Sequence, residues 1–335
     1  MRAVRMHGIG ELRLEEVPRP DAVAGGSVLL RVRAAGICGS DLHNFLTGQW
    51  ISRLPVIPGH ELAGEVVDVG TGVEGLGRGD LVVADSRVSC GACPACREGR
   101  HNVCERLGYV GEVCDGGFAE FVSLPASQLL RVPAGVPAEI AALAEPLGVA
   151  LHVIRRLAPV RGEPILLAGA GPVGGLAAIA LDHLGFGPLF VIERNAERAA
   201  LVASLTRATI VPAEVSAILA AAAGAPIRRA VEASGSPALL DVLVRGLGAG
   251  GRLALVGLYH GPLRVNLNAV IEREIDVVGS SVFRDEQREA LAMLVPLRDK
   301  LARAISVPIT LDEVPRAYGR LIAGETGTLK TIVRP

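Results

Sequence analysis

Apolar and polar residues alternate in short runs along the first part of the chain. Valine, leucine and alanine dominate these runs, and glycine and proline residues separate them. The runs are SVLLRVRAAG (27–36), ELAGEVVDVG (61–70), DLVVAD (80–85) and FAEFVSL (118–124). Alternation over this length is typical of half-buried strands, and glycine and proline favour turns between them. The pattern predicts an irregular β-rich domain of antiparallel strands.

The spacing of apolar residues changes at about residue 138. The segment IAALAEPLGVALHVIRRLA (140–158) has helical periodicity, and short apolar strands then alternate with helices. We expect strands at 164–169, 188–193, 228–233, 251–257 and 274–280. We expect helices at 172–185, 194–205, 215–223 and 236–247, and a further helix, QREALAMLVPL, at 287–297. Strand–helix repetition at this spacing predicts a doubly wound parallel sheet, so the fold class is α/β.

The two patterns divide the chain into domains. Its 335 residues suffice for two domains of ordinary size, each with its own core. We place the β-rich domain at 1–145, with a cysteine-rich lobe at 88–106, and the parallel-sheet domain at 146–285. We expect the last segment, 286–335, to return to the first domain.

Charge and hydropathy narrow the choice of partners. The 34 Lys and Arg residues almost balance the 35 Asp and Glu residues, so no basic surface for nucleic acid is expected. The first twenty residues lack an apolar targeting segment, and no later stretch stays apolar for about 18 residues. We therefore expect a cytoplasmic protein that acts on small molecules, without nucleic-acid or membrane partners.

A glycine motif marks a dinucleotide site at the start of the second domain. Residues 165–174 read ILLAGAGPVG, in which an apolar strand turns into a helix through the order G-x-G-x-x-G. Such a turn lets the backbone approach a pyrophosphate, whose charge the amides and the helix N-terminus stabilise. The predicted cofactor-binding residues of the turn are Gly169, Gly171, Pro172, Val173 and Gly174.

Glu193 and its neighbours bear on the choice between NAD and NADP. Glu193 ends the second strand, nineteen residues past Gly174, where a carboxylate can accept hydrogen bonds from the adenosine ribose hydroxyls. Its charge repels the extra phosphate of NADP, but Arg194 and Arg198 follow closely and are able to bind that phosphate. We favour NAD over NADP, and the two arginines leave NADP open.

Four of the six cysteines form a metal-binding pattern. Cys90, Cys93, Cys96 and Cys104 supply four soft thiolates on one loop that glycine and proline punctuate. Four thiolates close a tetrahedral site, which indicates structural zinc rather than a catalytic ion. An iron–sulfur cluster and a regulatory disulfide are the alternatives.

A second set of metal-ligand types is dispersed along the first 145 residues. Cys38 lies in GICGSDLH, His60 and Glu61 lie in PGHE, and Glu145 lies in AEPLG. One thiolate, one imidazole and one or two carboxylates form a site that can keep a coordination position open for water or substrate. Spacing alone does not join them, because, taken singly, a cysteine such as Cys38 is more often a small buried hydrophobe and a histidine such as His60 a hydrogen-bonded loop residue.

Taken together, the motifs resemble those of the zinc-containing medium-chain dehydrogenases. The resemblance rests on GICGSDLH, PGHE, the Cys90–Cys104 lobe, DGGF (115–118), AEPLGVALH (144–152) and GAGPVG (169–174), and it covers about residues 26–285. Glu61 after His60, and Glu145 before a proline, are similar to the polyol branch with its sorbitol, idonate and threonine dehydrogenases. The resemblance implies a GroES-like catalytic domain, a Rossmann domain and a cleft between them.

The resemblance also implies roles for single residues of the catalytic site. Cys38, His60 and Glu61 match the catalytic-zinc ligands. Glu145 matches a residue that exchanges onto the metal or holds its water, so either Glu61 or Glu145 is the third ligand. Asp41 matches the residue that fixes the ring of His60.

Further residues are assigned by their places beside these motifs. Ser40 and His43 occupy the positions of the family's proton relay, although a surface histidine is the alternative for His43. Phe45, Trp50 and Phe118 are either walls of the substrate pocket or ordinary packing aromatics. Cys114 matches no ligand position, and we expect a half-buried, inert thiol there.

The implied activity is transfer of a hydride between a secondary alcohol, of a polyol or sugar-derived substrate, and NAD(P). The family implies two zinc ions per chain, one catalytic and one structural, and a homodimer or homotetramer that pairs through the strand at 274–281. Two rival functions are a non-catalytic dinucleotide-binding sensor or structural protein and a zinc-free quinone reductase-like enzyme. The joint presence of the metal ligands disfavours both.

Overall fold

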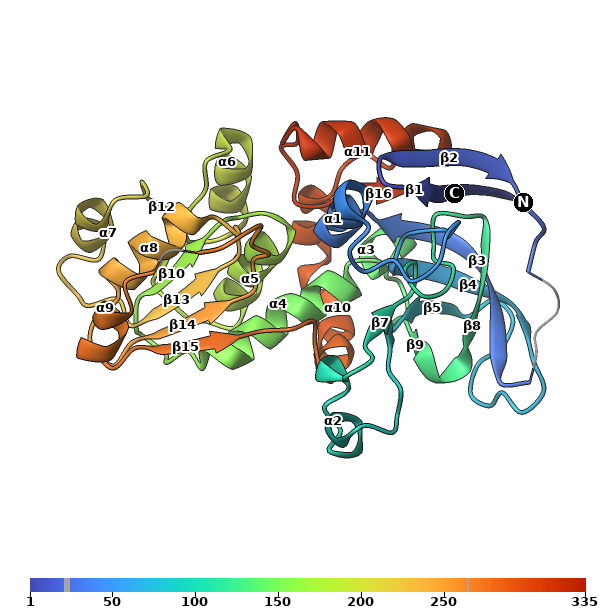
Figure 1. Ribbon diagram of the computed structural model, residues 1–335, viewed down its shortest axis with the longest axis horizontal. Helices are drawn as coiled ribbons and strands as arrows, with labels where there is room; N and C mark the ends of the chain where they lie inside the picture. Colours follow the sequence, from blue (N-terminus) through green and yellow to red (C-terminus); the bar gives the residue numbers. More distant parts are fainter. Residues whose placement is uncertain (21–24, 264) are drawn as a thin grey trace. The chain divides into compact units, whose positions relative to one another are not determined.

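The computed structural model describes residues 1–20, 25–263 and 265–335, which form two compact units (Figure 1). Unit 1 comprises Met1–Glu145, Gln287–Thr326 and Lys330–Pro335, and unit 2 comprises Pro146–Glu286 and Gly327–Leu329. The segment predicted to return to the first domain is therefore divided, because Gly327–Leu329 groups with unit 2. Leu329 lies against Gly175, where the absence of a Cβ makes room for the leucine side chain.

An antiparallel sheet of six strands forms the core of unit 1. Its order is β16 (Ile332–Val333), β3 (Ser27–Gly36), β4 (Glu61–Val69), β5 (Leu81–Ala84) and β9 (Leu129–Arg131), with β8 (Phe121–Pro125) also paired to β3. In β3 the side chains of Val28, Leu30 and Val32 are buried, whereas Arg31 and Arg33 are exposed. Each of the four predicted runs contains a strand, because alternation of this kind buries one face of the sheet.

Shorter elements complete unit 1. Two hairpins form from β1 (Arg2–Gly8) with β2 (Glu11–Glu16) and from β6 (Arg87–Val88) with β7 (Gly108–Tyr109). The α-helices are α1 (Gly39–Thr47), α2 (Pro94–Arg97), α3 (Ala138–Ala141), α11 (Val314–Ile322) and α10 (Glu286–Ala304), whose first residue belongs to unit 2. The structure extends the helix predicted at 287–297 by seven residues, to Ala304.

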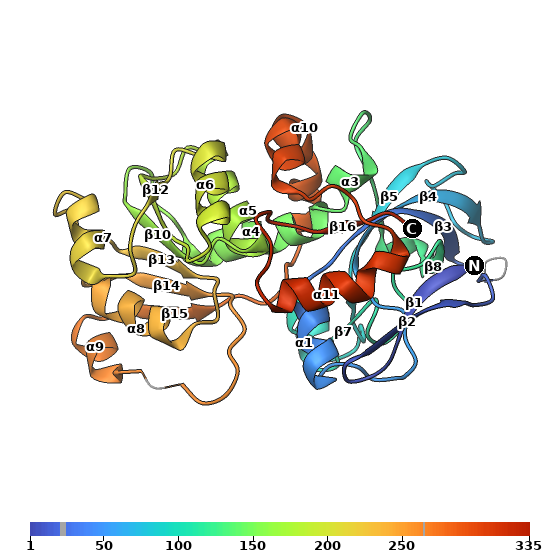
Figure 2. The ribbon, with the colours of Figure 1, turned by 90° about the horizontal axis from the view of Figure 1, so that it is seen from above.

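Unit 2 is built on a parallel sheet of six strands. The order is β12 (Thr209–Ile210), β11 (Leu189–Ile192), β10 (Ile165–Ala168), β13 (Arg229–Glu232), β14 (Arg252–Leu255) and β15 (Asp276–Gly279). The helices are α4 (Ala144–Leu157), α5 (Pro172–His183), α6 (Ala196–Leu205), α7 (Val215–Ala221), α8 (Pro237–Gly246) and α9 (Leu267–Glu272). Figure 2 shows α5 and α6 on one face of the sheet and α8 and α9 on the other. This order of strands confirms the predicted doubly wound sheet.

Two elements of unit 2 were absent from the predicted set. The edge strand β12 has only two residues, too few for a periodic signal. Helix α9 has six residues; Ala269 and Val270 pack against the core, but Leu267 and Ile271 are 64% and 71% exposed, so its apolar residues do not mark a single buried face in the sequence. Among the residues described, no helix combines the length and apolar character that crossing a membrane requires.

Candidate functional site

Four cysteine sulfurs converge in the lobe between β6 and β7. The Sγ atoms of Cys90, Cys93, Cys96 and Cys104 all lie within 4.8 Å of one another. The Sγ atoms of Cys90 and Cys96 are 4.0 Å apart, and those of Cys93 and Cys104 are 3.9 Å apart. Zinc bound tetrahedrally at about 2.3 Å from each sulfur requires sulfur–sulfur distances of about 3.8 Å. The four residues therefore fit a zinc ion.

Backbone amides donate hydrogen bonds to two of these sulfurs. The N–H of Cys90 donates to Sγ of Cys104 at 3.3 Å, and the N–H of Cys93 donates to Sγ of Cys90 at 3.4 Å. Hydrogen bonds from the backbone of Ala92 and Cys93 lower the pKa of the Cys90 thiol to about 6. The thiolate is the form that binds metal, so these amides favour the metal-binding state. All six cysteines are free of disulfides.

We expect Cys93→Ser to destabilise or aggregate the protein rather than to slow the chemical step selectively. The apolar cluster of the lobe consists mainly of its own cysteines, so the fold of this loop depends on the metal. The melting temperature should fall by at least about 3 °C, which corresponds to roughly 2 kcal/mol for a chain of 335 residues. Calorimetry and zinc analysis check this, and a variant with the original melting temperature and full zinc content would contradict it.

A second cluster joins the end of β3 to the start of β4. A sulfur of Cys38, a ring nitrogen of His60 and a carboxylate oxygen of Glu61 lie within 4.8 Å of one another. Gly36 of GICGSDLH stands opposite Glu61 in the sheet, and a Cβ at residue 36 would collide with the Glu61 carboxylate. Glycine at this position therefore permits the close approach. One thiolate, one imidazole and one carboxylate fit a zinc ion with an open coordination position.

Asp41 holds Cys38 and His60 in place. Cys38 is the N-cap of α1: its Sγ accepts the N–H of Asp41, and Oδ2 of Asp41 accepts the N–H of Cys38 at 2.8 Å. Oδ1 of Asp41 lies 3.4 Å from Nδ1 of His60. Burial lowers the pKa of His60, but the charges of Asp41 and Cys38 outweigh burial and raise that pKa well above its usual value. The negative potential at His60 favours a bound cation.

Glu145 lies outside this group of ligand atoms, so of the two carboxylates that the sequence left open only Glu61 belongs to it. The Glu145 side chain is buried, and its Oε1 accepts a hydrogen bond from Oγ of Ser86 at 2.8 Å. Burial raises the pKa of Glu145 to about 7, and the charge of Glu61 adds to this effect. Glu145 is thus a second carboxylate beside the cluster that is able to hold or release a proton near neutral pH.

Lys330 is a residue of this site that the sequence analysis missed. Its Nζ donates to Oε1 of Glu61 at 2.5 Å and to the carbonyl of Ile37 at 3.2 Å. The side chains of Lys330 and Glu61 are each 1% exposed. Burial lowers the pKa of Lys330, but the Glu61 carboxylate and the Cys38 sulfur raise it above its usual value. The sequence did contain one signal for Lys330, because this lysine stands in an apolar stretch next to β16. A lysine is rarely buried in such a stretch unless it is paired with an opposite charge.

Ser40 and His43 both lie on α1. Oγ of Ser40 is 3.5 Å from Nε2 of His60, at the edge of the second cluster. His43 is 8% exposed, its Nε2 is 2.7 Å from Oε1 of Gln49, and its ring centroid is 4.4 Å from that of Trp50. The structure thus places Ser40 beside a predicted metal ligand. It places His43 in a buried, partnered position instead of on the surface.

The glycine turn of unit 2 has the shape that a pyrophosphate requires. Gly169 has φ 91°, a conformation that favours glycine, and a Cβ at Gly174 would collide with the carbonyl of Gly169. Gly171 is the N-cap of α5, and Pro172 is the first residue of that helix. A Cβ at Gly171 would meet no other part of the described protein within 4 Å, so there is space for a phosphate at the helix N-terminus.

Glu193 follows β11 and is bound to the glycine turn. Its Oε2 accepts the N–H of Ala170 at 2.8 Å, and its Oε1 accepts the N–H of Asn195 at 2.7 Å. Arg198 donates to Oε1 at 3.0 Å, whereas Arg194 is exposed. Burial raises the pKa of Glu193, but these hydrogen bonds lower it below its usual value. Glu193 is therefore a stable anion beside the turn, and Arg198 is engaged with it.

The three aromatic residues proposed as pocket walls occupy different environments. Phe118 is fully buried, and its ring packs against Gly59 and Tyr318, so it belongs to the core and the pocket interpretation is wrong for it. Phe45 packs edge-on against Tyr318, with ring centroids 5.4 Å apart. Trp50 is 36% exposed and contacts His43. Of the three, Trp50 combines exposure with a contact to a predicted catalytic residue.

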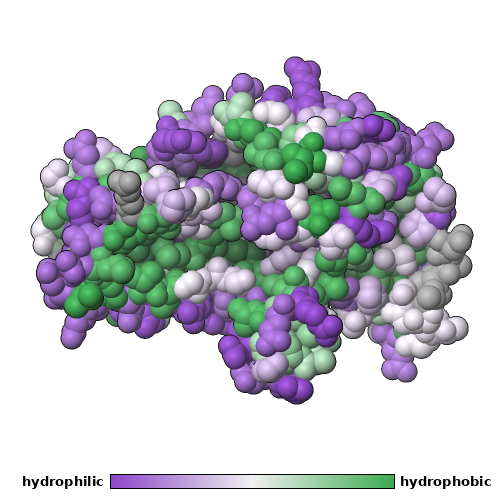
Figure 3. All heavy atoms as spheres, viewed as in Figure 1, coloured by the Kyte–Doolittle hydropathy of each residue, from purple (hydrophilic) through white to green (hydrophobic). Residues whose placement is uncertain are grey.

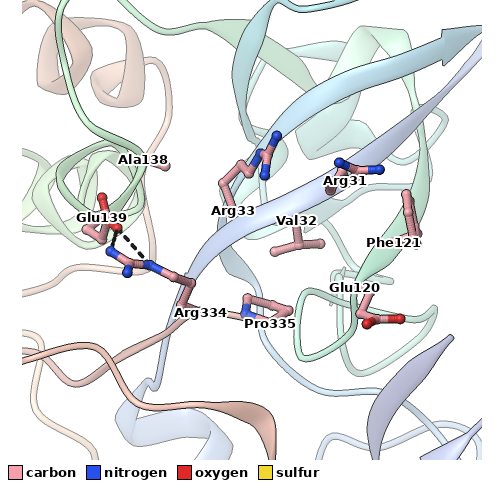
Figure 4. Close-up of a pocket in the computed structure, with 9 residues that line it drawn as sticks. All are labelled: Arg31, Val32, Arg33, Glu120, Phe121, Ala138, Glu139, Arg334 and Pro335. Carbon is pink, nitrogen blue, oxygen red and sulfur yellow. Dashed lines mark hydrogen bonds and ion pairs between the residues drawn. The ribbon is translucent and has the colours of Figure 1, made fainter.

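A surface pocket of unit 1 shares no residue with either metal cluster (Figure 4). Its lining includes Arg33, Phe121, Glu139 and Arg334. Arg334 pairs with Glu139, and Arg33 pairs with Glu65. Two of the lining arginines are thus paired with carboxylates, and the pocket is separate from the residues of the predicted chemistry.

Comparison with known proteins agrees with this arrangement. Residues 24–134 match the family "Alcohol dehydrogenase GroES-like domain", and residues 172–296 match the family "Zinc-binding dehydrogenase". The chain is 30% identical to an L-threonine 3-dehydrogenase of Shewanella frigidimarina, over 96% of this chain and 98% of the relative. It is also 30% identical to a sorbitol dehydrogenase of Bacillus subtilis, over 100% of this chain and 97% of the relative.

Solved structures give the same result. A Sinorhizobium meliloti protein named as a zinc-binding dehydrogenase, whose structure contains NADP, superposes with a TM-score of 0.90. The two sequences are 27% identical, and the superposition covers 100% of this chain and 99% of the other.

The fold and the site define a zinc-dependent alcohol dehydrogenase with a GroES-like domain and a Rossmann-type domain. The chain belongs to the zinc-binding, medium-chain dehydrogenase family, in the branch of the sorbitol and threonine dehydrogenases. It is an oxidoreductase that transfers a hydride between an alcohol and a nicotinamide cofactor. These relatives give no support to a non-catalytic sensor or a zinc-free quinone reductase.

Proposed function

We propose that the enzyme oxidises a secondary alcohol of a polyol or sugar-derived substrate, or reduces the corresponding ketone, and binds two zinc ions per chain. The observation that carries the proposal is the convergence of Cys38, His60 and Glu61 within 4.8 Å, beside Oγ of Ser40. When bound, zinc supplies a Lewis acid for the substrate hydroxyl, and the nicotinamide accepts the hydride. The relatives named as sorbitol and threonine dehydrogenases support a substrate with several polar groups.

Ser40 and His43 would remove the proton of the substrate hydroxyl. Ser40 accepts this proton beside the cluster and passes one on toward His43, three residues further along the same helix. Because the amide oxygen of Gln49 only accepts hydrogen bonds, Nε2 of neutral His43 carries the hydrogen in this arrangement. Nδ1 is then the nitrogen that takes up the proton before its release to solvent.

We expect His43→Ala to slow alcohol oxidation by about 10²-fold at low pH and much less at high pH. At high pH, hydroxide and buffer accept the proton that His43 normally removes, and small added amines should restore the rate at low pH. Zinc content should stay unchanged, because His43 lies outside both groups of ligand atoms. Pre-steady-state hydride transfer between about pH 6 and pH 10 checks this. A deficit independent of pH, or a loss of zinc, would identify His43 as a structural residue.

Cofactor choice follows from the surroundings of Glu193. Its carboxylate is anionic beside the turn that receives the pyrophosphate, and it engages Arg198. This arrangement favours the ribose hydroxyls of NAD and repels the additional phosphate of NADP. The NADP in the Sinorhizobium meliloti structure makes NADP the alternative, with the exposed Arg194 as the residue able to bind its phosphate.

A panel of polyols, sugar acids and threonine, each assayed with NAD and NADP, tests the proposed function. We expect turnover of at least one polyol class, with a higher kcat/KM for NAD than for NADP. The control variant Glu193→Ala should shift the preference toward NADP, because it removes both the ribose acceptor and the repelling charge. Higher kcat/KM with NADP in the unaltered enzyme would overturn the NAD assignment, and inactivity on the whole panel would overturn the substrate class.

We further propose a homodimer or homotetramer that forms through unit 2. Among the residues that the structure describes, β15 is the last strand of its sheet and one of its edges pairs with no other strand; its Val277 is 46% exposed. Exposed Leu267 and Ile271 of α9 add apolar surface, which is visible as a green area over α9 in Figure 3. Pairing of two β15 edges about a twofold axis would cover these groups.

A further inference from the structure

Glu112 is a buried acid that the proposed chemistry does not use. It lies after β7 and is 3% exposed. Its Oε1 accepts a hydrogen bond at 2.9 Å from Nδ2 of Asn44, which is also 3% exposed. Burial raises the pKa of Glu112 to about 7. Because burying two polar side chains costs free energy, a pair between residues 68 positions apart calls for a specific explanation.

Asn44 connects Glu112 to the turn that follows α1. While Nδ2 of Asn44 donates to Glu112, its Oδ1 accepts the N–H of Trp50 at 3.1 Å. The backbone carbonyl of Glu112 accepts the N–H of Ser52 at 3.5 Å. Residue 112 is therefore attached to the turn at 48–52 by two separate routes, one through Asn44 and one through its own backbone.

The same turn holds His43. Oε1 of Gln49 is 2.7 Å from Nε2 of His43, and the Trp50 ring lies 4.4 Å from the imidazole between centroids. Oγ1 of Thr47 donates to the carbonyl of His43 at 2.8 Å and accepts the N–H of Gln49 at 3.2 Å. The side chain and the backbone of His43 thus both depend on residues 47–50.

We infer that Glu112 is a positioning residue for His43, acting through Asn44 and the turn at 48–52. The inference rests on the proposed role of His43 as proton relay. The Glu112–Asn44 bond fixes the turn, and the turn fixes both the plane of the imidazole and the hydrogen on Nε2, so that Nδ1 is kept as the acceptor. Without this bond, the ring is held less tightly and spends less time in the accepting orientation.

A pair of substitutions that exchanges the donor and the acceptor of the Glu112–Asn44 hydrogen bond tests this inference. Asn44→Asp keeps the acceptor for the N–H of Trp50, but it places a second carboxylate against Glu112 and removes the donor. Glu112→Gln keeps an acceptor oxygen for Asn44. In the double variant Asn44→Asp/Glu112→Gln, the new amide donates to the new carboxylate and restores the hydrogen bond in the opposite direction.

Fluorescence reports directly on the position of His43. Trp50 is the only tryptophan in the chain, and its ring lies against the imidazole of His43, with the ring centroids 4.4 Å apart. The emission of Trp50 therefore depends on the presence and position of the imidazole, and His43→Ala should change it. We expect Asn44→Asp to produce at least about half of that change and the double variant to restore the original emission. Emission of Asn44→Asp equal to that of the unaltered enzyme would overturn the inference.

Kinetics test the consequence for proton transfer. We expect Asn44→Asp to slow hydride transfer about tenfold at low pH, with the deficit shrinking at high pH, and the double variant to recover to within about twofold. Zinc content and melting temperature serve as controls for folding. A rise in KM for the alcohol without a pH-dependent deficit would mean that Glu112 contacts substrate, and failure of the double variant to recover would mean a packing role. Either result overturns the inference.

Comparison of His43→Ala with Asn44→Asp distinguishes an error in the relay role of His43 from an error in the positioning role of Glu112. If His43→Ala itself shows no pH-dependent deficit, the relay role is wrong, and with it the kinetic consequence of Glu112. If His43→Ala shows the deficit and Asn44→Asp does not, the relay stands and the positioning role of Glu112 is wrong.

Discussion

Replacement of Cys38 by serine should remove one of the two zinc ions that we propose for each chain and slow hydride transfer by at least about 10³-fold. Cys38 supplies the thiolate of the group that includes His60 and Glu61. A catalytic metal contributes several kcal/mol to the transition state, and about 4 kcal/mol corresponds to 10³-fold in rate. Serine keeps an N-cap acceptor for α1, so the helix and its residues should remain folded. Zinc analysis measures the number of zinc ions per chain, calorimetry measures whether the protein remains folded, and single-turnover kinetics measure the rate of hydride transfer.

Cys114→Ser is the matched control for this experiment. Cys114 is half-buried and lies outside both groups of ligand atoms, and burial raises its pKa, as expected for an inert thiol. The control should keep both zinc ions and the original rate. Retention of both zinc ions by Cys38→Ser, or a rate within about tenfold of the original, would contradict the assignment of Cys38 as a metal ligand.

Local sequence patterns were sufficient to predict much of the fold and part of the site. The strands of four or more residues in the two six-stranded sheets were predictable because burial of one face, or of both, leaves a regular spacing of apolar residues, whereas the shorter strands β9, β12 and β16 were not predicted. The cysteine lobe was predictable because four ligands fall within fifteen residues, Cys90–Cys104, of one loop. The glycine turn was predictable because only glycine permits the conformation at Gly169 and the close approach at Gly174.

Contacts between distant segments were not predictable from those patterns. Lys330 reaches Glu61 across 269 positions, and Asn44 reaches Glu112 across 68 positions, and neither pair leaves a local periodic signal. The choice between Glu61 and Glu145 likewise depends on the distances of both carboxylates from Cys38, which the sequence does not contain. Phe118 looked like a pocket residue because it lies in a motif, but its side chain packs against Gly59 in the core.

Lys330→Met should lower the free energy of unfolding far more than the roughly 0.5 kcal/mol of an ordinary surface substitution. The ammonium of Lys330 is paired with Glu61 at 2.5 Å, and both side chains are 1% exposed. Removal of one partner of a buried ion pair leaves an uncompensated charge and costs about 3–5 kcal/mol. In the Cys38→Ser background, where Glu61 no longer serves as a ligand of the catalytic zinc, Glu61→Gln/Lys330→Met removes both charges and should lose clearly less stability than Lys330→Met. Denaturant unfolding in the presence of zinc measures the free energy of unfolding of the single variant and of the double variant.

The size of this loss depends on whether Glu61 also binds the catalytic zinc. If it does, the metal remains as a positive partner after Lys330→Met, and the loss should be smaller than the full cost of a buried, unpaired carboxylate. In the Cys38→Ser background, where that zinc is absent and the cysteine lobe is intact, the loss should reach the full value. We therefore expect a difference of at least about 1 kcal/mol between the two backgrounds. Equal losses would mean that Glu61 pairs with Lys330 alone, and the carboxylate ligand of the zinc would then have to be Glu145, whose side chain is buried beside the same cluster.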